Sequence, residues 1–308
     1  MGASGRAHYG GLLRCGSVWA CPVCGSAIRA GRAEEVRRAV ERHGSKRALL
    51  LSLTVRHGLG HALRGVRQGV AKAWTRMIRG APWKRFAKRI GLVGLIRALE
   101  VTHGPENGWH PHIHALVLTG RTLDDAEVSD AAIWLSERWQ ECVQRALGEE
   151  HRPDYAHGCD LRSCHSADYI AKLGLELTAP GRSKRAKRQN RTPMEIAYDF
   201  VTEGLRRDAD LWTDFCESMY GARMLTWSRN LRRKLGLPTE VSDDDLAQQT
   251  ETNEILALIP GQAWDAMRDT LGVRSALLEA AEREGLDGVI ALVNRLSSGF
   301  SARGSPLD

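Results

Sequence analysis

The sequence has no apolar run long enough to span a lipid bilayer, and its first residues lack the basic-then-apolar order of a signal peptide. These two absences argue against a helical membrane protein and against a secreted one, and we expect a cytoplasmic protein. At 308 residues, 43% of them hydrophobic, the chain is long enough to bury a core in one large domain or in two smaller ones.

The sequence also lacks the even number of cysteines that a disulfide framework needs. Seven cysteines in a reducing compartment favour a metal site instead. Cys15 precedes the pair Cys21 and Cys24, whose Cys-x-x-Cys spacing on a tight turn lets both thiolates reach one tetrahedral Zn²⁺. A redox dithiol uses the same spacing, but no thioredoxin-like strand comes before it, so we predict a structural zinc site. The choice of fourth ligand stays open among His8, Cys159, Cys164 and His165.

The excess of basic residues predicts an anionic partner. A formal charge of +7 and a pI of about 9.2 favour nucleic acid, although arginine-rich composition by itself is weak evidence. Residues 181–191 form a basic, polar run without apolar periodicity. We expect this run to contact phosphate when DNA is present, and a solvated linker explains it equally well in the absence of DNA. Its candidate DNA contacts are Arg182, Lys184, Arg185, Lys187 and Arg188.

The most informative stretch is residues 108–118, which reads Gly-Trp-His-Pro-His-Ile-His-Ala-Leu-Val-Leu. Its second half is typical of a buried strand. Alternate strand residues point to the same face, so His110, His112 and His114 project together while Ile113 packs into the core. Imidazoles in such a row can share one divalent cation, and three of them favour metal binding over a set of hydrogen-bonded core histidines.

A second strand, predicted at residues 92–102, leads through a Gly-Pro-Glu-Asn-Gly loop into the histidine strand, which predicts a hairpin. Glu100 is an acid within this otherwise apolar strand, close to the turn. There it can lie across from the histidines as a third ligand. An exposed glutamate is the competing interpretation, and the sequence weights the two about equally.

The remaining patterns predict further elements of an α+β fold. We expect strands at residues 48–55 and 156–162, and helices at residues 26–43, 61–79, 124–147, 166–174, 194–206, 209–220 and 225–235. The helix at residues 166–174 begins after a serine cap and places Tyr169 and Lys172 on one face. An isolated tyrosine on a helix is usually a packing residue.

Three motifs follow one another along the chain: Leu-Ser-Leu-Thr at residues 51–54, Gly-Trp-His-Pro-His-Ile-His at residues 108–114, and Ala-Asp-Tyr-Ile-Ala-Lys at residues 167–172. They resemble the signature motifs of the HUH endonucleases, and more narrowly the rolling-circle replication initiators (Rep proteins) of high-GC Gram-positive plasmids. The cysteine arm and the Leu-Thr-Trp-Ser-Arg segment at residues 225–229 are also similar to that family. The resemblance therefore covers most of residues 10–250.

The resemblance implies a fold and a domain order. The fold is an antiparallel HUH sheet, ferredoxin- or RRM-like, with helices on one side, an N-terminal zinc knuckle and a helical C-terminal region. The expected segments are a zinc-knuckle arm with its helix (1–45), the HUH endonuclease domain (46–178), a basic linker with a helical extension (179–240) and a small helical accessory region (241–308).

The resemblance also implies a chemistry. His112 and His114, with Glu100, would hold Mg²⁺ or Mn²⁺, and the cation would polarise a scissile phosphate. Tyr169 would attack that phosphate, leaving a 5′-phosphotyrosine and a free 3′-OH, while Lys172 would ease ionisation of the phenol. His110 would belong to the outer shell of the metal. The expected role is initiation of rolling-circle plasmid replication at single-stranded or hairpin origin DNA, with a host helicase as a further partner.

Two alternative functions compete with this one. An HUH transposase or relaxase would use the same chemistry, but relaxases usually carry the tyrosine before the histidine motif and Tyr169 follows it. A non-catalytic zinc DNA-binding regulator would leave the histidine row without a role.

The tyrosine motif has a single tyrosine, so a terminating hydrolysis would need another group to activate water, and Asp168 and His165 are the adjacent candidates.

Overall fold

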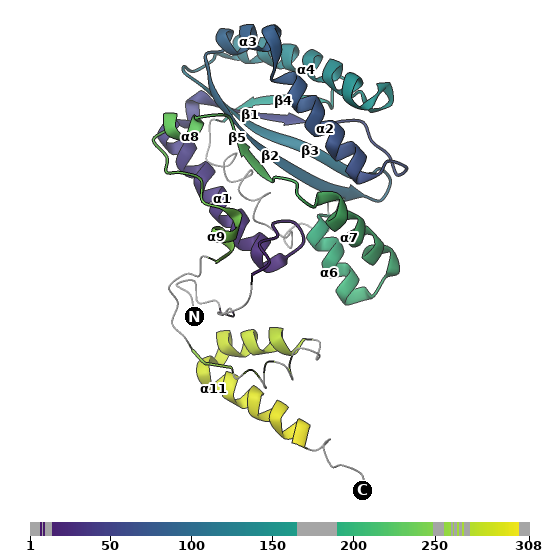
Figure 1. Cartoon of the computed structure of the whole chain (residues 1–308), viewed down its shortest axis with the longest axis vertical. Helices are drawn as coiled ribbons and strands as arrows, with labels where there is room; N and C mark the ends of the chain where they lie inside the picture. Colours follow the sequence, from purple (N-terminus) through teal and green to yellow (C-terminus); the bar gives the residue numbers. More distant parts are fainter. Residues whose placement is uncertain are drawn as a thin grey trace. The chain divides into compact units, whose positions relative to one another are not determined.

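The computed structural model describes residues 14–164, 190–248, 256–259 and 272–301, together with residues 7, 9, 261, 264 and 267. The chain divides into two compact units. The larger unit is Cys15–Ala247, and the smaller one combines Met1–Arg14 with Gln248–Asp308. Figure 1 shows both units along the chain.

A five-stranded antiparallel sheet forms the centre of the larger unit, with the strand order β4-β1-β3-β2-β5. The bounds are β1 Ala48–Leu53, β2 Leu92–Gly104, β3 Gly108–Thr119, β4 Cys159–Ser163 and β5 Leu225–Trp227. Strands β2 and β3 form the expected hairpin, and Gly108 closes it at φ 69°, a conformation that a side chain would disfavour. The α+β fold predicted from the sequence is confirmed.

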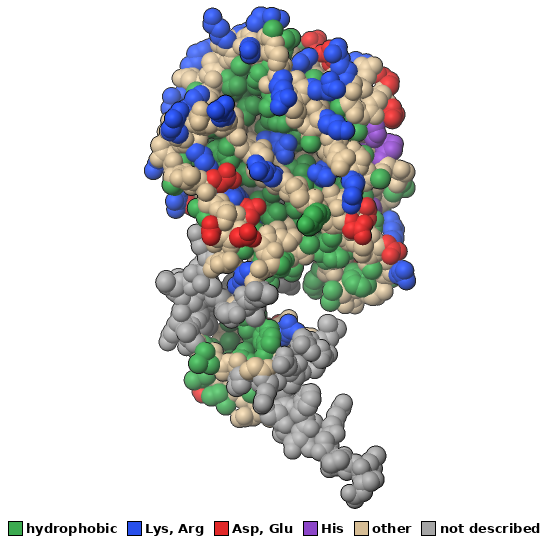
Figure 2. Space-filling view, in the orientation of Figure 1, with side chains coloured by type: hydrophobic (Ala, Val, Ile, Leu, Met, Phe, Trp, Pro, Cys, Tyr) green, Lys and Arg blue, Asp and Glu red, His purple; other side chains and the backbone are tan. Residues whose placement is uncertain are grey.

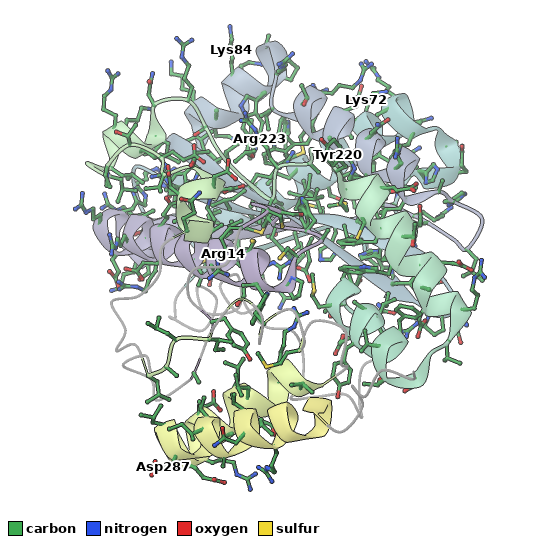
Figure 3. The ribbon with its side chains drawn as sticks, turned by 60° about the horizontal axis from the view of Figure 1, so that its bottom comes forward. Arg14, Lys72, Lys84, Tyr220, Arg223 and Asp287 are labelled. Carbon is green, nitrogen blue, oxygen red and sulfur yellow. The ribbon has the colours of Figure 1, made fainter. Side chains whose placement is uncertain are left out.

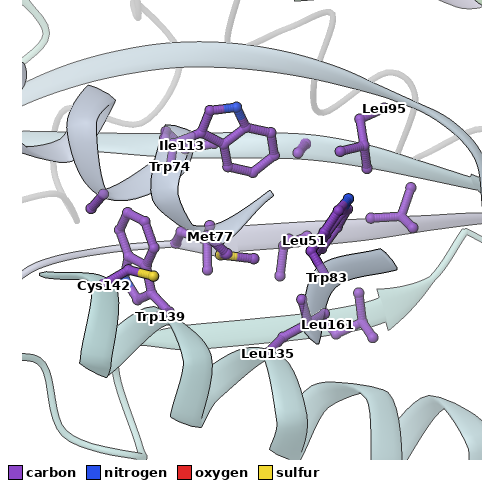
Figure 4. Close-up of a cluster of buried hydrophobic side chains, with 14 of the residues drawn as sticks. Leu51, Trp74, Met77, Trp83, Leu95, Ile113, Leu135, Trp139, Cys142 and Leu161 are labelled. Carbon is purple, nitrogen blue, oxygen red and sulfur yellow. The ribbon is translucent and has the colours of Figure 1, made fainter. Parts of the chain in front are cut away.

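Three helices cover one face of this sheet: α2 Leu63–Met77, α3 Gly80–Arg89 and α4 Asp125–Leu147. The alternate residues of the strands that point to this face, such as Leu51 and Ile113, pack against Met77, Leu135 and Trp139 (Figure 4). These side chains are at most 1% exposed, and each one buried stabilises the fold by about 1.5–3 kcal/mol. This is the main core of the unit.

The opposite face of the sheet is partly covered by the N-terminal helix α1, Pro22–His43. Leu50, Ile96 and Leu116 point to this side and pack against Ile28 and Val36 of the helix. The prediction of helices against one face therefore holds for α2, α3 and α4, and α1 adds partial cover on the other face. The histidine row lies on this same face of the sheet, along β3.

Two further helices, α6 Pro193–Glu203 and α7 Arg206–Met219, pack beside the tip of the β2–β3 hairpin. Trp109 anchors them, since its ring lies against Phe215 and its Nε1 donates to Asp214 at 2.7 Å. Arg191 enters this region through a β-bridge to His103 and hydrogen bonds to Asp208 at 2.7 and 2.8 Å. That contact lowers the pKa of the Asp208 carboxyl, which is itself buried.

The helix predicted at residues 225–235 is wrong. Residues Leu225–Trp227 form strand β5 on the outer edge of β2, and only Leu231–Lys234 is helical, as α8. The free edge of β2 offers unpaired backbone groups, and pairing with them outweighs the local helical pattern.

Other boundaries also differ from the predicted ones. Helix α1 begins at Pro22, four residues early, because Cys21 caps it and proline suits a first helical position. Helix α2 ends at Met77, two residues before its predicted end, and Gly-Ala-Pro at residues 80–82 then begins α3, with Pro82 within its first turn. The remaining short elements are η1 Ser45–Arg47, η2 Glu149–His151 and α9 Asp243–Gln248.

The smaller unit is centred on α11, Val273–Ser301, which is interrupted at Gly285. Leu277, Ala281 and Val289 of this helix form a small core with Met267. Tyr9 packs against this core, and its hydroxyl donates to the carbonyl of Arg274 at 2.8 Å. Within the part of the chain that the structure describes, no helix has both the length and the apolarity that crossing a membrane requires.

Candidate functional site

The hairpin brings a glutamate and two histidines together on the face of the sheet opposite α2. Glu100 lies directly across from His112 in the register of β2 and β3, and His114 is one step along the same face. The Glu100 Oε2 atom is 3.1 Å from His112 Nε2 and 3.3 Å from His114 Nε2. One potential ligand atom from each residue therefore lies within 4.8 Å of the others.

The outer nitrogens of both imidazoles have partners that fix the rings. His112 Nδ1 lies 3.1 Å from the carbonyl oxygen of His110, which can only accept, so a neutral His112 keeps its Nε2 lone pair facing Glu100. His114 Nδ1 lies 2.9 Å from the hydroxyl of Ser52 on β1. Ser52 is a polar residue on the same side of its strand and pairs with His114 in register. Such contacts orient metal-binding histidines.

The charge balance of this group fits a divalent cation. Burial opposes ionisation of Glu100, but contacts with His112 and then His114 outweigh it and hold the pKa of the carboxyl well below its usual range. Its Oε2 atom is buried and takes no hydrogen bond of good geometry, although two imidazole nitrogens are close. A carboxylate oxygen and two imidazole nitrogens form a donor set that suits Mn²⁺ and tolerates Mg²⁺.

The third histidine of the row, His110, is not part of this group. Its Nδ1 contacts His57 Nε2, and His57 Nδ1 in turn lies 2.8 Å from the carbonyl oxygen of Asn107. Burial, followed by the neighbouring His112 and His57, lowers the pKa of His110 to about 3, so its ring is neutral at pH 7. Sequence reasoning missed both Ser52 and His57. For Ser52 a signal exists, because a polar residue interrupts an apolar strand.

The predicted nucleophile lies outside the described residues. This applies to Tyr169 and Lys172, to His165 and Asp168, and to the basic run that contains Arg182, Lys184, Arg185, Lys187 and Arg188. The described chain before them ends at Cys164, whose amide donates to the carbonyl of Ala48. Cys164 packs with Leu50 and Leu116, which places it on the same face of the sheet as the glutamate and histidines.

A second group of potential metal ligands lies at the start of α1. The sulfur atoms of Cys15, Cys21 and Cys24 are all within 4.8 Å of one another, and Cys15 Sγ is 3.8 Å from Cys24 Sγ. Cys21 is the N-cap of the helix, and its sulfur accepts the Cys24 amide at 3.4 Å. Gly25 is needed beside them, because a Cβ there would lie 2.7 Å from the carbonyl oxygen of Val18.

The structure narrows the choice of a fourth ligand for this group. The described cysteines Cys159 and Cys164 do not belong to it, and burial raises the pKa of their thiols to about 12 and about 11. The other two candidates, His8 and His165, lie outside the described residues.

Comparison with known proteins gives one family. Residues 14–268 match a protein family, Rep_1, that is described as "Replication protein". The chain belongs to this replication protein family. The expected resemblance to Rep proteins is thereby confirmed, and both groups of metal-ligand candidates lie inside the matched residues.

Individual Rep relatives agree with the family match. A "Protein rep" of Streptomyces lividans is 33% identical over 93% of this chain and 78% of its own length. A "Protein rep" of Lentilactobacillus hilgardii is 23% identical over 83% of this chain and 79% of its own. One from Streptococcus pneumoniae is 29% identical over 42% of this chain and 37% of its own. No solved structure is a significant match.

Proposed function

We propose that this Rep family protein initiates rolling-circle plasmid replication by metal-dependent nicking and rejoining of single-stranded origin DNA. The observation that carries the proposal is the convergence of Glu100, His112 and His114 on one face of the central hairpin, in a chain of the replication protein family. Mg²⁺ or Mn²⁺ held there would supply Lewis-acid polarisation of the scissile phosphate. The expected partners are origin DNA and, as a further candidate, a host helicase.

The nucleophile in this proposal is Tyr169. Its phenol oxygen forms a bond to the phosphorus while the bond to the 3′ oxygen breaks, which leaves a 5′-phosphotyrosine and, after protonation, a free 3′-OH. Attack of a 3′-OH on the phosphotyrosine reverses the step and rejoins the strand. The phenol is protonated at pH 7, and Lys172, one turn away in sequence, would stabilise the developing phenolate.

The distance between Cys164 and the metal-ligand group supports this role for Tyr169. Four residues along β1 and two interstrand spacings separate Cys164 from His114, which corresponds to about 17 Å. Two extended residues followed by three residues of the expected helix span about 11 Å from Cys164, and the tyrosine side chain would cover much of the remaining distance. Cys164 already lies on the correct face of the sheet.

A covalent adduct with DNA tests the proposal. Wild-type protein, incubated with single-stranded origin DNA and Mn²⁺, should give an adduct that survives a denaturing gel. Tyr169→Phe should give none, while Tyr155→Phe, at an exposed tyrosine on the same unit, should react like the wild type. An adduct of normal yield with Tyr169→Phe would show that another residue is the nucleophile.

The metal ligands have a separate test. His112→Ala combined with His114→Ala should abolish adduct formation but keep most origin binding, because phosphate and groove contacts supply affinity independently of the metal. His157→Ala, which removes an exposed histidine, is the matched control.

If DNA binds but no divalent metal supports an adduct in the wild type, the alternative of a non-catalytic zinc DNA-binding regulator replaces this proposal. Adduct formation on transposon ends or a transfer origin would favour a transposase or relaxase.

We also propose that Cys15, Cys21 and Cys24 hold a structural Zn²⁺ that anchors the N-terminal arm to α1. Three thiolates at this spacing form a donor set that suits zinc. Cys21→Ser with Cys24→Ser should remove the zinc found by elemental analysis, whereas Cys216→Ser, at a partly buried cysteine elsewhere, should not. An unchanged zinc content in the double variant would rule the site out. We further propose the division of the chain into the four segments expected from the sequence, residues 1–45, 46–178, 179–240 and 241–308.

A further inference from the structure

The net positive charge of the chain is concentrated in one stretch of sequence. From Arg42 to Leu99 there is no aspartate or glutamate, and the stretch holds 14 of the 44 lysines and arginines. The other 30 basic residues are outnumbered by 37 acidic ones elsewhere in the chain. The excess of positive charge therefore belongs to this stretch, which includes helices α2 and α3.

Helices α2 and α3 present these charges to solvent. The exposed cations form a surface that we call the α2–α3 basic surface: Lys72, Arg76, Arg79, Lys84, Arg85, Lys88 and Arg89. Lys72, Arg76 and Arg79 follow one face of α2 and its end, and the four on α3 share its outer face. Figure 2 shows basic side chains gathered over the end of the unit where Figure 1 places α3. Figure 3 labels Lys84 and Lys72, whose side chains extend outward.

These cations have no carboxylate partner among the described residues, whereas several other exposed arginines of the chain do have one. Arg37 and Arg38 pair with Glu34 at 2.6 Å, and Arg145 pairs with Glu141 at 2.6 Å. Seven cations without a carboxylate partner on neighbouring helices create a positive field. Such a field attracts a polyanion.

The chemistry of the exposed side chains indicates which kind of polyanion this surface binds. The aromatic residues of α3, Trp83 and Phe86, are buried, and Phe86 stacks on Trp134 at 4.0 Å between ring centroids. No large apolar side chain of α2 or α3 is exposed. Single-stranded DNA binding relies on exposed aromatic platforms, and membrane binding relies on exposed apolar groups. A surface with cations alone is suited to the phosphate backbone of duplex DNA.

We propose that the α2–α3 basic surface binds the phosphate backbone of duplex DNA without reading its sequence. This surface and the Glu100–His112–His114 group lie on opposite faces of the sheet, so the duplex held here is separate from the strand at the nicking site. The proposal rests on the proposed function in taking DNA as the partner, but it does not depend on the tyrosine chemistry. It adds a second DNA contact that would keep the protein on the plasmid next to the origin.

The test removes the four positive charges of α3 and compares the effect on DNA binding with the loss of four positive charges elsewhere on the chain. The surface variant is Lys84→Gln, Arg85→Gln, Lys88→Gln and Arg89→Gln. The control variant carries the same charge change at exposed arginines that do have carboxylate partners: Arg37→Gln, Arg38→Gln, Arg145→Gln and Arg206→Gln. Binding to a labelled duplex without origin sequence is measured by fluorescence anisotropy over a series of salt concentrations. Circular dichroism checks that both variants fold.

The surface variant should bind this duplex about tenfold or more weakly at low salt, and the slope of log affinity against log salt should become shallower by about 0.9 for each phosphate that the variant no longer neutralises. The control variant should stay within about twofold of the wild type. Equal losses in both variants, unchanged binding by the surface variant, or no duplex binding by the wild type would each overturn the proposal, as would binding to anionic lipid vesicles in place of the duplex.

A second measurement separates this proposal from the proposed function. Adduct formation on a short single-stranded origin oligonucleotide with Mn²⁺ should be unchanged in the surface variant, because that DNA need not reach α3. Loss of adduct formation with duplex binding intact would overturn the surface proposal. Absence of adduct in the wild type, with weaker duplex binding in the surface variant, would instead overturn only the nicking proposal.

Discussion

At the scale of single residues, the candidate metal group depends on contacts that orient its ligands. Glu100 and His112 face each other because the hairpin register makes them direct partners, so their approach follows from β-sheet geometry. The orientation of the His114 ring depends in addition on a side-chain contact, because Ser52 on the neighbouring strand holds its Nδ1 atom. Ser52 is therefore a positioning residue whose hydroxyl acts through His114.

Replacing Ser52 with alanine should weaken divalent metal binding. The Ser52→Ala change removes the hydroxyl beside His114 Nδ1, and removing such a supporting hydrogen bond lowers metal affinity by about 10- to 100-fold. The stability of the protein should fall by only about 1 kcal/mol, since a single hydrogen bond is removed. Mn²⁺ titration by calorimetry measures the affinity. Ser218→Ala, at a buried serine bonded to Asp214, is the control, and equal affinities in both variants would contradict this role for Ser52.

At the scale of elements, helix α2 contains two glycines with opposite surroundings, one packed against α4 and one in open space. Gly69 faces the end of α4, where a Cβ would overlap the side chain of Leu147. Gly65 lies four residues earlier, and a Cβ added there would have no contact within 4 Å. Both lie in the same helix, so their different surroundings alone decide the effect of a methyl group.

We expect Gly65→Ala to stabilise the protein by up to about 1 kcal/mol, because alanine favours the helix over glycine. Gly69→Ala should destabilise it by about 1–3 kcal/mol, because overpacking against Leu147 outweighs that gain. Adding Leu147→Ala to Gly69→Ala should recover part of the stability if the overlap is the cause. Denaturant unfolding gives the three free energies. A Gly69→Ala variant as stable as Gly65→Ala would show that α4 yields without strain.

At the scale of the whole molecule, the two compact units have separate cores. The larger unit, Cys15–Ala247, contains the sheet and both candidate metal groups, and the smaller unit packs Tyr9 against α11. Each core is formed by residues of its own unit. The nicking chemistry that we propose therefore uses residues of the larger unit alone.

A fragment comprising residues 15–247 should keep metal-dependent adduct formation with single-stranded origin DNA, because its core, its candidate ligands and Tyr169 are all present. The yield of adduct should be within about threefold of the full chain, since the fragment keeps every metal-ligand candidate found among the described residues. The same fragment with His112→Ala and His114→Ala should be inactive. A fragment that folds by circular dichroism but forms no adduct would show that the smaller unit contributes to the reaction.

The sequence alone determined the features that depend on local periodicity. The alternation of His112 and His114 around Ile113, the turn that makes the hairpin, and the Cys-x-x-Cys spacing are each properties of a few consecutive residues, whose backbone geometry fixes where the side chains point. Glu100 could be placed opposite the histidines because a hairpin register is nearly local as well. Its role as a ligand stays a prediction.

Only the tertiary structure decided the features that join distant segments. It placed Ser52 beside His114 and His57 beside His110, and it made Leu225–Trp227 a strand on the edge of β2. It also placed α2 and α3, with their cations, on the face opposite the candidate metal group. These contacts depend on the pairing order of the strands and on core packing, which arise from the whole chain folding together and leave no periodic signal in a short window of sequence.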